Sequence, residues 1–187
     1  TPDSFSDGGE FLDRPDAGRA HAAAMLEAGA AMVDIGGEST RPGAQFVPAA
    51  EEAARVVPVI EALTAKGLGP ISVDTRKACV AKAALAAGAG LFNDVTALTF
   101  DPDSLSIAAK SGAAVCLMHS SGTPKTMQDN PSYNNALLDV YDFLHERVET
   151  CVAAGIPRAR IMVDPGLGFG KTHSHNLALL RGISLFH

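Results

Sequence analysis

Three polar side chains share a chemistry that suits the recognition of a flat, donor-rich ring. Asp74, Asn93 and Asp164 each stand at or just after the end of a short apolar run that is typical of a buried strand. Carboxylates accept hydrogen bonds, and a carboxamide both donates and accepts them. If these strands end at one edge of a sheet, the three groups together can bind a heterocycle with amino, ring N–H and carbonyl groups, such as a guanine-like or pterin edge.

Such a ring also needs an apolar surface to lie on. Met118 ends another apolar run, and Phe169 follows Asp164 in a glycine-rich segment, so we expect both on the same rim. The alternative for these two side chains is an ordinary place in the core. A lone Asp or Asn at a strand end also often caps the next helix. Because polar residues follow five successive apolar runs, a shared site is favoured for the set.

A second polar segment has the residues to hold an anion. Ser39, Thr40, Arg41 and Pro42 lie between glycines, and the planar fork of an arginine suits an oxyanion or a carboxylate. The alternative is a surface arginine in a turn. Residues 1–9 (TPDSFSDGG) form another polar, glycine-ended segment, which includes Asp3, Ser4 and Phe5. We interpret it as the loop that follows a strand preceding Thr1.

Three other patterns give weaker evidence about function. Residues 163–172 resemble a nucleotide-binding P-loop, but Pro165 stands where that motif needs a glycine, so an ATPase is not predicted. A backbone anion site in this segment stays open. His173 and His175 have no third partner at metal-ligand spacing and are interpreted as the polar start of a helix. No nucleophile–base set indicates covalent catalysis, and the role of His119 is left open.

Composition narrows the class of protein. The chain has 187 residues and a formal net charge of −6, without a basic stripe, so we expect no nucleic-acid partner. No apolar run approaches the ~18–20 residues of a membrane span, and no signal peptide is recognisable. The 3 cysteines are predicted to be buried thiols in a reducing compartment, which indicates the cytoplasm. The length fits one domain.

The elements that must position these residues alternate strictly. Helix-period stretches are expected at 16–28, 48–65, 77–87, 101–110 and 134–154, with a last helix starting near His175. Asp101 is expected to cap the fourth of them, with Pro102 in its first turn. Apolar runs of strand length are expected at 31–35, 70–73, 90–92, 113–118 and 160–163.

Strict alternation of strand and helix predicts parallel strands joined by right-handed crossovers. This leaves a doubly wound sheet or a (β/α)8 barrel. Polar residues at the carboxyl end of every strand favour the barrel, since a doubly wound sheet concentrates them at one switch point. A whole barrel needs ~250 residues. We therefore predict a partial (β/α)8 barrel domain over residues 1–187, with about five central βα units and a trailing helix.

Together these segments resemble the dihydropteroate synthase family of folate biosynthesis. The matching stretches run in the family's order and are residues 1–9, 34–43 (DIGGESTRPG), 72–75 (SVDT), 92–95 (FNDV), 118–119 (MH) with 122–124 (GTP), and 164–171 (DPGLGFGK). The resemblance implies a barrel enzyme, a sulfonamide target and a homodimer when full length. It implies that 6-hydroxymethyl-7,8-dihydropterin diphosphate is joined to 4-aminobenzoate, with Mg2+ assistance and release of diphosphate.

The resemblance also implies roles for single residues. Asp74, Asn93 and Asp164 match residues that hold the pterin, and Met118 and Phe169 match residues that pack around it. Thr40 matches a residue at the diphosphate end. Ser39, Arg41 and Pro42 belong to the second substrate loop of the family. Asp3, Ser4 and Phe5 belong to the first.

Some parts of the family's site fall outside these residues. The asparagine that binds Mg2+ matches a position upstream of Thr1, so no metal ligand is expected in this chain. The cationic segments of the last two strands match positions beyond His187. Two alternatives follow: an inactive or interaction-only fragment of the same enzyme, and a pterin-dependent methyltransferase. The methyltransferases lack the loops at 1–9 and 39–43, which favours the synthase.

Overall fold

The computed structural model describes residues 15–41, 43–122 and 126–187. Its strands are β1 (Val33–Gly36), β2 (Ile71–Asp74), β3 (Leu91–Asp94), β4 (Ala114–Met118) and β5 (Ile161–Asp164). They form one parallel sheet in the order β1-β2-β3-β4-β5. The predicted α/β class, with about five strand–helix units of a barrel, is confirmed.

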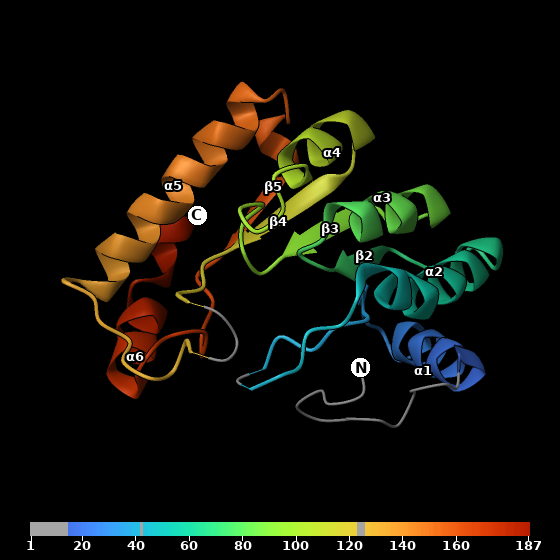
Figure 1. Cartoon of the computed structure of the whole chain (residues 1–187), viewed down its shortest axis with the longest axis horizontal. Helices are drawn as coiled ribbons and strands as arrows, with labels where there is room; N and C mark the ends of the chain where they lie inside the picture. Colours follow the sequence, from blue (N-terminus) through green and yellow to red (C-terminus); the bar gives the residue numbers. More distant parts are fainter. Residues whose placement is uncertain (1–14, 42, 123–125) are drawn as a thin grey trace.

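Helices alternate with the strands along the chain. They are α1 (Pro15–Glu27), α2 (Ala49–Ala65), α3 (Ala78–Ala87), α4 (Ser104–Ser111), α5 (Ala136–Ala153) and α6 (His173–Arg181), with short 3-10 turns η1 (Arg158–Arg160) and η2 (Ile183–Phe186). The helices follow one another around an arc in chain order, with the strands inside it (Figure 1). This is the arrangement of an incomplete barrel.

The two faces of the sheet differ in polarity. Side chains alternate along a strand, so residues two apart share a face. The face toward the helices carries apolar side chains that join two core clusters, namely Val33, Ile71, Val73, Phe92, Val115 and Leu117. By the strand register, the opposite face carries the polar residues Asp34, Ser72, Asp74, Asn93 and Asp164, interspersed with Leu91, Ala114, Cys116, Met118 and Met162. The inner face of the arc, the polar face, therefore carries the predicted ring-binding residues among apolar neighbours.

One predicted helix start is wrong. Helix α4 begins at Ser104 instead of near Pro102, and Asp101 does not cap it. Asp101 Oδ2 accepts a hydrogen bond from the backbone N–H of Ala78 at 2.9 Å, and Oδ1 accepts one from Asp103 N–H at 3.0 Å. Asp101 therefore binds the amino-terminal end of the neighbouring helix α3, a contact that the local sequence does not reveal.

Candidate active site

Four strands bring the predicted ring-binding residues to one face of the sheet. Asp74 and Asn93 are register partners, and Asn93 in turn pairs with Cys116 of β4. Asp164 pairs with Met118, two residues further along β4 on the same face. Burial and then the charges of Asp164, Asp34 and Asp74 raise the pKa of the Cys116 thiol to about 11. The charges of carboxylates from three strands therefore act on one thiol.

Asp34 belongs to this cluster, although sequence reasoning left it out of the ring-binding set. Its Oδ2 accepts a hydrogen bond from Nδ2 of Asn93 at 3.2 Å. The pattern that could have identified it is alternation, because Asp34 lies between the core residues Val33 and Ile35 and must point to the other face. Asp94, the residue after Asn93, points to the opposite face of the sheet. Asp94 is buried on the helix side, where it accepts bonds from Thr96 and Leu98.

The Asp74 carboxyl carries the strongest electrostatic perturbation of the set. Burial, followed by the charges of Asp34 and Asp94, raises its pKa well above the ordinary value of 3.8. Its Oδ1 is buried and has no hydrogen-bond partner among the described residues. Buried acceptors are nearly always satisfied. A ligand with N–H donors would supply the missing partner.

The two predicted apolar residues lie at the same rim. Met118 ends β4, is 4% exposed and sits opposite Asp164. Phe169 is half-buried in the turn after β5, where its N–H donates to the Gly166 carbonyl at 3.1 Å. Asp164 itself shapes this turn, because its Oδ1 accepts the Gly166 N–H at 2.7 Å. Residues 164–169 therefore form one folded rim above the polar face.

The glycine-rich segment after β5 binds its own lysine instead of offering an anion site. The Lys171 ammonium lies 2.8 Å from the Gly166 carbonyl, 2.9 Å from the Phe169 carbonyl and 2.9 Å from Nδ1 of His119. This arrangement disfavours an anion-binding nest at the centre of the turn, because carbonyl oxygens face the Lys171 ammonium there. Burial, and then the lysine charge, lower the pKa of His119 to about 4. Burial lowers the pKa of Lys171 to about 8, which the charge of Asp164 opposes.

The anion-binding candidates lie on the loop after β1. Thr40 and Arg41 are half-buried, and the Arg41 N–H donates to the Ser39 hydroxyl at 3.4 Å. The Arg41 carbonyl accepts the Ala44 N–H at 3.1 Å, which closes a turn at the tip of the loop. Pro42 lies outside the described residues, as do the loop residues Asp3, Ser4 and Phe5. Their predicted places at the site stay predictions.

No metal-binding cluster is present among the residues that the structure describes: no three His, Cys, Asp or Glu side chains are placed to hold an ion. His175 forms a capping box with Thr172 at the start of α6, as its interpretation as a polar helix start requires. None of the helices within the described ranges is long and apolar enough to cross a membrane.

The comparison with known families matches this geometry. A family described as "Pterin binding enzyme" matches residues 1–187, the whole chain. The chain belongs to the pterin-binding enzyme family. The pterin-binding family that the motifs indicate is thereby confirmed.

Individual pterin-binding enzymes are similar over nearly all of this chain. Dihydropteroate synthase of Escherichia coli is 46% identical over 187 residues, which are 100% of this chain and 66% of the relative. A Yersinia pestis dihydropteroate synthase, whose structure contains a sulfonamide drug complex, is 50% identical with a TM-score of 0.93. The match covers 98% of this chain and 66% of the Yersinia chain. A Xanthomonas albilineans dihydropteroate synthase in complex with 7,8-dihydropteroate is 42% identical with a TM-score of 0.81. This match covers 91% of this chain and 61% of the Xanthomonas chain. The chain thus spans about two thirds of these relatives.

Proposed function

We propose that the complete protein is a dihydropteroate synthase in folate biosynthesis. It would join 6-hydroxymethyl-7,8-dihydropterin diphosphate to 4-aminobenzoate and release diphosphate. One observation carries the proposal: the inner face of the sheet holds Asp74, one oxygen of which is buried without a hydrogen-bond partner among the described residues, next to Asn93 and on the same face as Asp164. The relatives described above are synthases, and one of them holds the product that contains both halves.

The proposed reaction needs no nucleophilic side chain. The C–O bond between the pterin methylene and diphosphate breaks, and the diphosphate leaves with the electron pair. The amine nitrogen of 4-aminobenzoate forms the new C–N bond and then loses a proton to solvent. Asp74 and Asp164 orient the ring and favour its electron-poor form, and Arg41 stabilises the departing negative charge. Met118 and the 164–169 rim exclude water from the reacting carbon.

Mg2+ has no assigned ligand in this proposal. The described residues offer no cluster that fits the ion. The participation of Mg2+ is proposed from the family resemblance alone. We extend the proposal to a cytoplasmic location, supported by three cysteines that are free thiols. Their predicted burial is correct for Cys151 alone, because Cys116 is half-buried and Cys79 lies on an exposed part of α3. A homodimer is proposed from the resemblance, and light scattering on the purified protein would test it.

The pterin site can be tested by calorimetric titration of the complete protein with a dihydropterin. Asp74→Ala and Asp164→Ala are each expected to weaken dihydropterin binding by ~1–3 kcal/mol or more, because each leaves ring donors without a partner at a desolvated site. Glu149→Gln, which changes an exposed surface pair, is the control. Unchanged affinity in both aspartate variants would refute the assignment. Transfer of a methyl group without release of diphosphate would instead support a methyltransferase.

A further inference from the structure

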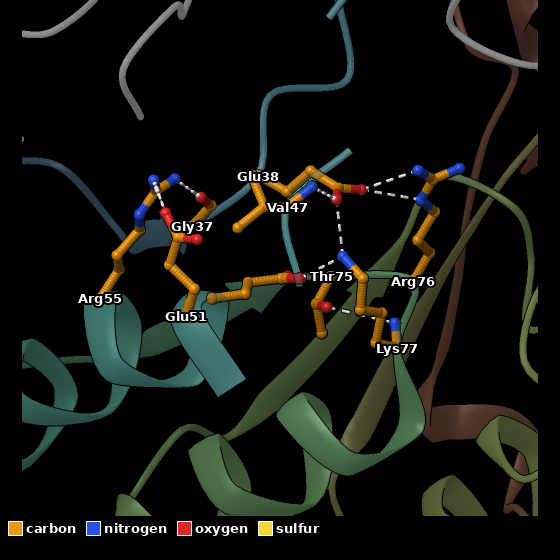
Figure 2. A network of polar contacts seen from close by, with 9 residues as sticks. Gly37, Glu38, Val47, Glu51, Arg55, Thr75, Arg76 and Lys77 are labelled. Atoms are coloured by element: carbon orange, nitrogen blue, oxygen red, sulfur yellow. Dashed lines mark hydrogen bonds and ion pairs between the residues drawn. The ribbon is translucent and has the colours of Figure 1, made fainter. Parts of the chain in front are cut away.

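A buried carboxylate stands at the base of the loop that carries Thr40 and Arg41. Glu38 is 5% exposed, and both of its oxygens are occupied. Its Oε1 accepts from Nε and Nη2 of Arg76, both at 2.8 Å. Its Oε2 accepts from Nζ of Lys77 at 2.6 Å and from the backbone N–H of Val47 at 2.8 Å. Figure 2 shows the carboxylate between these donors.

This arrangement joins the two ends of the loop. Glu38 begins the loop after β1, and Val47 lies at its other end, just before α2. One side chain therefore closes the base of the segment 39–46. Next to Val47, the Phe46 ring lies beside Lys77, whose ammonium is 4.7 Å from the ring centroid. Within the segment, the Arg41 carbonyl accepts the Ala44 N–H at 3.1 Å, a local turn that does not join the two ends of the loop.

The same carboxylate ties the loop to rigid neighbours. Arg76 and Lys77 belong to the turn between β2 and α3, directly after the proposed pterin ligand Asp74. Lys77 also binds Oε2 of Glu52 in α2 at 2.5 Å, and Glu52 is fully buried. Gly37 packs so closely on α2 that an added Cβ would lie 2.9 Å from Glu52 atoms. The loop base is thus fixed between a strand end and a helix.

The charges of this cluster balance. Two carboxylates, Glu38 and Glu52, face two cations, Arg76 and Lys77. Burial alone would raise the pKa of Glu38, but the hydrogen bonds from Lys77 and Val47 and the charge of Arg76 outweigh it and leave the pKa below its ordinary value. Charge-assisted hydrogen bonds between buried groups are short and strongly directional. The carboxylate is therefore a firm anchor at neutral pH.

We propose that Glu38 is a positioning residue that holds Thr40 and Arg41 over the polar face by clasping both ends of their loop to the β2–α3 turn. The role rests on the proposed function for what the loop binds, but the clasp itself is independent of it. Glu38 touches no substrate in this proposal. Its loss is expected to reduce turnover, because Arg41 must meet the diphosphate in one geometry, while leaving the pterin ligands in place.

Two measurements separate the clasp from the activity. The bond after Phe46 suits chymotrypsin, since the ring is 61% exposed, and the N–H of that bond is the one that Glu38 holds. Cleavage needs the loop to open. Glu38→Gln keeps the size of the side chain but places an amide donor among donors. In the naturally produced protein we expect cleavage after Phe46 at least tenfold faster, kcat at least tenfold lower and dihydropterin affinity within twofold.

Two further variants keep the test decisive. Glu149→Gln is the control, because Glu149 forms an exposed pair with Arg158 and has no contact with the Glu38 cluster among the described hydrogen bonds and ion pairs. Arg76→Met removes the bonds to Glu38 Oε1, together with the stacking of Arg76 on the Phe100 ring, and is expected to speed cleavage about threefold. If Glu38→Gln does not fold, this variant decides. Folded variants cleaved no faster than Glu149→Gln would overturn the clasp, and faster cleavage with unchanged kcat would overturn the positioning role. Faster cleavage in a protein without synthase activity would uphold the clasp and refute the proposed function.

Discussion

Two buried lysines border the site, and the protein satisfies their charges in different ways. Lys77 and Lys171 are each 4% exposed. Lys77 meets formal negative charges, the carboxylates of Glu38 and Glu52. Lys171 meets dipoles, namely the carbonyls of Gly166, Phe169 and His119 and the ring nitrogen of His119. An ion pair leaves a buried charge behind when one partner is lost, whereas dipoles respond to the loss of a cation more mildly.

The difference follows the two loops that the lysines serve. The Lys77 cluster anchors a loop whose residues we propose to bind an anion, and its balanced charges hold at neutral pH. The Lys171 contacts fold the rim after β5 and connect it to β4 through His119. With the pKa of Lys171 lowered to about 8, this contact is sensitive to moderate changes of pH. One region is built to be fixed, and the other can titrate.

Lys77→Met gives the largest expected effect. It leaves Glu38 and Glu52 buried without their shared cation, and breaking a buried ion pair in this way costs ~3–5 kcal/mol. Urea unfolding followed by circular dichroism would measure the loss. A loss below about 1 kcal/mol would mean that water reaches the cluster and would remove the distinction between the two lysines. The double variant Lys77→Met with Glu52→Gln should recover part of the stability.

The loss of folding stability at acid pH, the acid limb of the stability profile, should come mainly from His119. Its pKa is about 4 in the folded protein and near 6.5 when unfolded, so the unfolded chain binds more protons between these values. Stability should therefore be complete above pH 6.5 and fall as the pH drops toward 4, by at most about 3 kcal/mol. His119→Gln should flatten this limb in the same unfolding series. An unchanged limb would show that the imidazole is solvated. Glu38, with its lowered pKa, should add a further loss only below pH ~4.5.

Lys171→Met should cost less than Lys77→Met. It leaves carbonyl oxygens without a donor, a loss of ~1–3 kcal/mol. It should also abolish an alkaline gain in stability. In the native protein the unfolded chain binds more protons between pH 8 and 10.5, so stability rises with pH across that range. Persistence of this rise in the variant would assign it to another group.

Arg41→Lys should have the smallest effect on stability, because it keeps the charge on a half-buried loop residue. It loses the planar fork that suits a diphosphate. We expect turnover to fall several-fold more than dihydropterin affinity does, measured by steady-state kinetics and calorimetry. Equal losses in both would indicate a structural arginine and would separate the Glu38 clasp from the chemistry.

Local sequence determined most of the architecture. Apolar runs and helical periodicity placed every strand and helix within a few residues, because each element buries one face and must repeat at its own period. The polar residue after each run indicated the strand ends at which the candidate site is built. The motifs DIGGESTRPG and DPGLGFGK were specific enough to indicate the family that the whole-chain match established. The start of α4 was missed because Asp101 binds a helix more than twenty residues away in sequence.

Only the tertiary structure decided which polar residues meet. Asp34 and Asn93 are 59 residues apart, and parallel pairing through β2 brings their side chains together. Asp94 differs from Asn93 by one position, yet the alternation of the strand sends it to the helix side. Glu38 and Lys77 likewise gain their roles from contacts across 39 residues. The chemical character of a side chain can be read from its residue type. Whether distant side chains come together depends on strand register and burial, which local sequence patterns do not contain.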